Sequence, residues 1–357
     1  MLALRLARGS RPLVQLRRLL VAAASAGTGF LLLYVLAEAV AQPAGSFPRL
    51  LWALIPLAVT VHFAVVVART DPANRPREGM DAAGLGPVRL MLVAAISTAV
   101  ACALGAALAL AVFLHLRGDV AGLPFDGAGA KLLHADQPLP VAGALTLLVL
   151  LPLTGSAAAA LALRPRAPLP PQTGLPWGIT LTACGLAGLA YAGRTGTGVL
   201  VGWSMTAIGL ALAGPGLAHA CGSLVQAVRP GALRLLAGRI LQQEASRIGP
   251  PLGVLCAVAA AALTALALRD RGGLPIPLGP LTWPAALLVA LCAAATLLTS
   301  VVEARGSREP GRTALLALGA PSNVLRSAAS LRATALLAVC LPLSWGVAQL
   351  TSLALTR

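Results

Sequence analysis

The sequence predicts an all-α polytopic membrane protein with about nine transmembrane helices. Of its 357 residues, 58% are hydrophobic and only 11% are charged, and the mean hydropathy is +0.85. Soluble domains carry roughly a quarter charged residues, so this composition excludes a water-soluble globular enzyme. Apolar runs of about 20 residues, long enough to cross a bilayer, recur along the chain. The basic residues also gather on alternate connections between these runs.

Nine apolar runs are bounded by Arg, Pro or Gly clusters. They lie at about 19–40, 50–68, 90–115, 139–163, 177–193, 197–222, 250–268, 281–302 and 331–353. The first run follows a basic segment, as in a signal peptide, but it is too long for the apolar core of one. Only residues 192–196 separate the fifth and sixth runs. A re-entrant hairpin there is an alternative to two crossings, and it leaves the sidedness of the other runs unchanged.

The distribution of basic residues predicts how the chain is oriented. With the N-terminus in the cytosol, 20 of the 27 basic residues fall on the cytosolic side and seven on the other. This positive-inside asymmetry explains most of the net charge of +16 without a nucleic-acid partner. We therefore expect a multi-pass protein of the plasma membrane, in contact with lipid, with a cytoplasmic N-terminus and an extracytoplasmic C-terminus.

Short matches between distant segments indicate an internal repeat. The tetrapeptide Ala-Leu-Arg-Leu occurs at 3–6 and again at 232–235, each time about a dozen residues before an apolar run. These matches predict two parallel repeats of three spans, each preceded by an interfacial helix, within 1–116 and 225–357. Three further spans within 117–224 connect them. Six crossings separate the first and seventh spans, so both repeats enter the membrane in the same direction. Chance similarity in an Ala- and Leu-rich chain is the alternative.

The segment 301–326 begins at the end of an apolar run and continues through charged residues into a Leu-rich stretch. Its characteristic residues are Glu303, Arg305, Arg308, Glu309, Leu315, Leu316, Leu318 and Gly319. This pattern resembles the FtsX-like permease family of ABC transporters, in which a span ends in an Arg- and Glu-rich turn, and a short Leu-rich helix and the next span follow. A degenerate copy lies at 71–89, with Arg77, Glu78, Leu85 and Gly86.

This resemblance implies a permease subunit whose short helix docks on a separate ATPase subunit, beside a second permease chain. The pattern predicts that the helix is broken at Gly319 and that the chain restarts at Ser322 or Asn323. A helix that only seals the inner end of the bundle is the alternative. The MacB-type members carry a large extracytoplasmic domain, whereas the connections at 41–49 and 269–280 are short. The second repeat also ends after three spans, where the family usually has a fourth.

The sequence predicts no enzymatic activity for the chain itself. It contains no phosphate-binding P-loop motif, and its single lysine, Lys131, is expected outside the cytosol. We therefore expect ATP and Mg²⁺ on the partner subunit, and no cofactor or metal on this chain. His62, in the second span, is a candidate for a substrate path; a neutral, hydrogen-bonded histidine is the alternative.

The expected function is export or extraction of an amphipathic or hydrophobic substrate, driven by the partner ATPase. A non-transporting transmembrane regulator driven by the same kind of ATPase is the alternative. A lipid-modifying enzyme would need clustered acidic or basic groups at one membrane face. The 11 acidic residues are instead dispersed along the chain.

Overall fold

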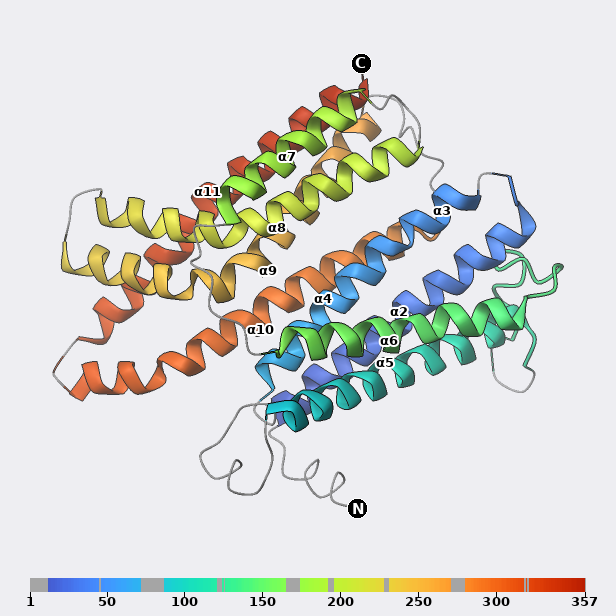
Figure 1. Ribbon diagram of the computed structural model, residues 1–357, viewed down its shortest axis with the longest axis horizontal. Coiled ribbons are helices and arrows are strands. Elements are labelled where there is room, and N and C mark those ends of the chain that lie inside the picture. Colours follow the sequence, from blue (N-terminus) through green and yellow to red (C-terminus); the bar gives the residue numbers. More distant parts are fainter. Residues whose placement is uncertain are drawn as a thin grey trace. The chain divides into compact units, whose positions relative to one another are not determined.

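The computed structural model describes residues 12–44, 46–71, 87–120, 124, 126–164, 174–191, 196–227, 231–270, 280–317, 319 and 321–356. These residues form helices and contain no strand. The helices are α2 (Pro12–Ala41), α3 (Ser46–Trp52), α4 (Leu54–Thr70), α5 (Pro87–Arg117), α6 (Val141–Ala162), α7 (Gly174–Tyr191), α8 (Gly196–Ala227), α9 (Ala232–Asp270), α10 (Thr282–Ala317) and α11 (Ser322–Thr356) (Figure 1).

Eight helical segments of the described chain are long and apolar enough to cross a membrane. They are Val14–Ala41, Ser46–Thr70, Met91–Arg117, Val141–Ala162, Thr197–Ala227, Ala232–Arg269, Thr282–Glu309 and Asn323–Thr356. The chain is therefore a multi-pass membrane protein, and its described part is all-α. The predicted fifth span corresponds to α7, which is not among the eight. Its glycines, threonines and terminal tyrosine lower the apolarity of its 18 residues.

The chain forms two compact units. Unit 1 comprises Met1–Arg166 and Gly279–Cys292, and unit 2 comprises Ala167–Leu278 and Ala293–Arg357. The helix α10 begins in unit 1 and continues in unit 2. The three-part division at 116 and 224, and the two repeats, stay predictions.

Unit 1 is built around α2, which packs against α3, α4, α5 and α6. Figure 1 shows α2, α5 and α6 running alongside one another. Phe30 and Phe113 meet edge to face with ring centroids 5.6 Å apart, inside an apolar core that includes Leu33 and Leu151. Such helices are apolar on nearly every face because their outer surface contacts lipid rather than water.

In unit 2, α8 packs between α7 and α9, and α11 packs against all three. The α7–α8 contact depends on glycine. A Cβ atom at Gly185 would lie 2.6 Å from the backbone N of Thr206, and one at Gly178 would lie 2.5 Å from the backbone N of Ala213. Small residues let helix backbones approach closely, which increases dispersion contact where no hydrophobic effect drives helices together.

Two helices are longer than the sequence analysis predicts. The expected interfacial helix of the second repeat is not separate, because α9 runs unbroken from Ala232 through Pro250 and Pro251 to Asp270. Its N-terminal part buries Leu241, Ala245 and Ile248, so it packs within the protein. The expected short helix after 302 is likewise not separate, since α10 continues to Ala317. Both expectations of a separate helix were wrong.

Candidate functional site at the charged end of α10

The charged part of α10 extends beyond the predicted apolar span as one continuous helix. The segment from Glu303 to Ala317 is about 22 Å long at 1.5 Å per residue. Six residues singled out by the sequence lie on it, four of them charged. Arg305 and Glu309 are exposed, whereas Glu303 and Arg308 are half-buried.

Arg308 is held by a bidentate ion pair with Glu244 on α9. Its Nε donates to Oε1 of the carboxylate and its Nη2 donates to Oε2. Glu244 is only 8% exposed, so water screens the pair weakly. Bidentate guanidinium–carboxylate pairs fix geometry as well as adding attraction, so this contact ties the extension of α10 to α9.

A second guanidinium lies within electrostatic range of the same carboxylate. Arg332, on α11, is close enough to Glu244 and Arg308 to feel both charges. Its Nε donates to the carbonyl of Ala328 at 3.2 Å, and its Nη1 is buried without a hydrogen-bond partner among the described residues. Within this group of three described side chains, Glu244 pairs with Arg308 and attracts Arg332 at longer range, so one positive charge is in excess.

The break after α10 is where the sequence predicts it. Gly319 has φ of +88°, a left-handed conformation that glycine adopts without steric cost, and α11 begins at Ser322. Leu315 and Leu316 lie on α10, but their side chains, and Leu318, are outside the described part of the chain. The secondary loop residues Arg77, Glu78, Leu85 and Gly86 also lie outside it. An apolar docking face on these leucines stays a prediction.

Unit 1 also contains a buried acid paired with an arginine on another helix, but the acid and the arginine occur in the opposite order along the chain. Asp71, at the end of α4, is 6% exposed and accepts a 2.6 Å hydrogen bond from Nη2 of Arg18 on α2. The neighbouring Arg17 also feels the charge of Asp71. In unit 1 the earlier helix of the pair, α2, carries the arginine, whereas in unit 2 the earlier helix of the pair, α9, carries the acid.

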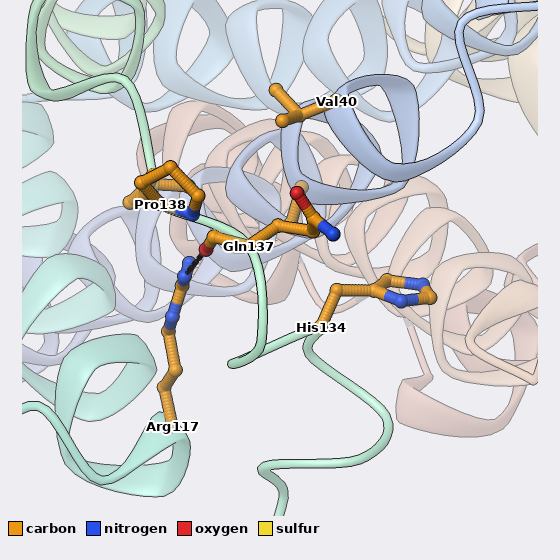
Figure 2. Close-up of a pocket in the computed structure, with 7 residues that line it drawn as sticks. Val40, Arg117, His134, Gln137 and Pro138 are labelled. Atoms are coloured by element: carbon orange, nitrogen blue, oxygen red, sulfur yellow. Dashed lines mark hydrogen bonds between the residues drawn. The ribbon is translucent and has the colours of Figure 1, made fainter.

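A separate cluster of polar side chains lies at the C-terminal end of α2. Glu38 pairs with Arg49 at 3.0 Å and with Nε2 of His134 at 2.9 Å. Arg117 donates to the backbone carbonyl of Gln137, and Figure 2 shows His134 pointing away from this contact. The cavity lined by Arg117, His134 and Gln137 is too small for a water molecule, so the cluster anchors the described part of the connection 118–140 and leaves no room for a ligand.

His62 lies on α4 and is half-buried. Its Nε2 is buried without a hydrogen-bond partner among the described residues. It lines neither the cavity beside Arg117 nor the one beside Arg18. A substrate path at His62 stays a prediction.

Sequence reasoning missed Glu244, Arg332 and Asp71 as site residues. One sequence feature could have indicated Glu244: it is the first acidic residue after Ala232, in a segment whose other charged residues are arginines. Its partner lies 64 positions away, so no local pattern identifies the pair.

No protein-family model, curated protein or solved structure matches this chain. A functional proposal therefore depends on the chain's own residues and on the geometry of the site.

Proposed function

We propose that this chain is the permease subunit of an ABC transporter. It couples ATP hydrolysis on a separate subunit to the export or extraction of an amphipathic or hydrophobic substrate. In this proposal the charged ends of α9 and α10 face the cytosol of a cell whose plasma membrane holds the protein. A second permease chain, identical or related, completes the complex, because an ATPase dimer offers two docking surfaces.

The observation that supports the proposal most is that α10 is one continuous helix, which runs from its apolar span into its charged extension. A continuous helix is stiff along its axis, so a displacement applied at its charged end reaches its membrane segment. The Arg308–Glu244 pair joins this extension to α9, and α9 packs against α8 and α11. A partner that moves the end of α10 would therefore move several helices of unit 2. The family-like residues on this same segment further support the proposal.

The first experiment is purification of the tagged chain from its native membrane. We expect an ATPase subunit with a P-loop to co-purify, and ATP hydrolysis to require that subunit. Hydrolysis by the isolated, homogeneous chain would contradict the proposal. So would a purified complex that is active in transport but contains no nucleotide-binding subunit.

The second experiment places a charge on the predicted docking face. Leu316→Asp should abolish co-purification of the ATPase, because an unpaired carboxylate buried in an apolar contact costs more than the several kcal/mol lost on burying a neutral polar group. The matched control is Ser307→Asp, at an exposed position of the same helix. Full ATPase binding and full substrate-stimulated hydrolysis in Leu316→Asp would show that the segment only seals the bundle.

A further inference from the structure

Unit 1 contains a second polar site, at the Arg18 end of α2, that the proposed function does not use. A cavity of about 20 Å³ lies between α2, α4 and α5. This volume holds about one water molecule or one oxygen atom of a larger group. Its polar lining is Arg18, Asp71, Ser97 and Thr98, and the remaining wall is aliphatic.

The charge at this site is unbalanced. Asp71 is buried and already pairs with Arg18 at 2.6 Å, yet Arg17 lies within range of the same carboxylate. Among the described residues at this site, the two guanidinium groups of Arg17 and Arg18 share the charge of one carboxylate, which leaves one positive charge in excess. The Arg18 side chain is still 40% exposed, so an anion can reach it from outside the bundle.

The site lies at the boundary between the polar and apolar parts of α2. Leu19 and Leu20 follow Arg18 directly, and both are exposed. Exposed leucines contact hydrocarbon, so the adjacent guanidinium groups lie at the depth of the lipid headgroups, where arginine side chains at helix ends favour the interface.

An apolar surface leads away from the cavity along α5. Ser97 and Thr98 line the cavity, and the exposed large side chains on this helix include Leu92, Val93, Ile96, Val100, Leu104 and Leu108. The acyl tail of a lipid bound at the cavity mouth would pack on these exposed side chains of α5. A free inorganic anion would gain nothing from that surface.

We propose that this site binds the phosphate headgroup of an anionic phospholipid in the leaflet at the Arg18 end of α2. The phosphate accepts hydrogen bonds from the exposed guanidinium of Arg18 at the cavity mouth, and Arg17 adds long-range attraction. Basic pockets between transmembrane helices recognise anionic headgroups in this way. The excess positive charge selects an anionic lipid over a zwitterionic one. This proposal does not depend on transport or on an ATPase partner.

The test is native mass spectrometry of the purified full chain, titrated in detergent with dioleoyl phosphatidylglycerol or dioleoyl phosphatidylcholine. The key variant is the double substitution Arg18→Gln with Asp71→Asn, which keeps the net charge and replaces the ion pair by a neutral hydrogen-bonding pair. Non-specific attraction is therefore unchanged. We expect phosphatidylglycerol binding to weaken about fivefold in the double variant.

Two further variants make the result specific. Arg89→Gln, at an exposed position of α5, should leave binding within twofold of the original chain, although it removes a positive charge. Asp71→Asn alone should tighten binding, because Arg18 loses its competing anion, and misfolding cannot produce tighter binding. Size-exclusion profiles and melting curves report on the fold of each variant.

Three results would overturn the proposal. The double variant could bind phosphatidylglycerol as tightly as the original chain. Phosphatidylcholine could bind the original chain as tightly as phosphatidylglycerol does. Millimolar inorganic phosphate could displace the lipid and bind by itself, which would identify a free-phosphate site in place of a lipid site.

Discussion

A single carboxylate, Glu244, holds the charged end of α10 against α9. It is 8% exposed and accepts both hydrogen bonds of the Arg308 fork. Arg332 adds a second cation within electrostatic range. Removing the carboxylate would leave two guanidinium groups that repel each other in a poorly solvated place. The stability of this end of unit 2 therefore depends on one residue far more than on its exposed charges.

Glu244→Gln should destabilise the protein by about 3 kcal/mol, the usual cost of breaking a buried pair from one side. The measurement is thermal unfolding of the purified chain in detergent. Glu309→Gln is the control, because Glu309 is exposed and surface pairs contribute about 0–1 kcal/mol. Equal melting temperatures for the two variants would show that Glu244 is solvated and not part of a stabilising pair.

At the scale of elements, glycine positions determine how closely helices of unit 2 approach. The Cβ contact distances at Gly185 and Gly178 leave no room for a side chain, whereas a Cβ atom at Gly346 on α11 would have nothing within 4 Å. The α7–α8 contact thus tolerates only the smallest residue, while part of α11 faces open space.

Gly185→Ala should lower the melting temperature, because the added methyl group would lie 2.4 Å from Oγ1 of Thr206 and must push α7 from α8. Overpacking of this kind costs about 1–3 kcal/mol. Gly346→Ala is the matched control and should be neutral or slightly stabilising, since alanine favours helix over glycine. If both variants melted alike, the close approach of α7 and α8 would be wrong.

The continuity of α10 makes a second prediction at this scale, which rests on the proposed function. Gly306 lies within the charged extension, and a Cβ atom there would meet nothing within 4 Å. Gly306→Pro removes a helix hydrogen bond and bends or breaks the helix, so the ATPase should still bind while substrate no longer stimulates its hydrolysis. Gly306→Ala, at the same position, should keep both activities. Stimulated hydrolysis in the proline variant would refute transmission through a stiff α10.

For the whole molecule, the unequal distribution of basic residues predicts which ends of the helices face the cytosol. Exposed positions suited to testing this are Arg164 after α6, Arg305 on α10, and Asp126 in the connection 118–140. Arg308 is less suitable because it is half-buried in its ion pair with Glu244.

Single cysteines at these positions, in a chain whose six native cysteines are replaced, report the topology. An impermeant thiol reagent applied to intact cells should label Asp126→Cys but not Arg164→Cys or Arg305→Cys. The latter two should react once the membrane is permeabilised, which shows that they are accessible. Labelling of Arg305→Cys from outside would reverse the predicted orientation.

The all-α, multi-pass architecture is determined by the sequence alone, because a 20-residue apolar run has to satisfy its backbone hydrogen bonds internally in lipid, which favours a helix. The helix break at Gly319 is also readable locally, since glycine favours the φ of +88° found there. The tertiary structure alone decided that α9 and α10 continue past their apolar runs, and that Glu244 meets Arg308 and Asp71 meets Arg18. These partners are 64 and 53 positions apart in the chain. Their pairing depends on how whole helices pack, which local patterns of residues do not encode.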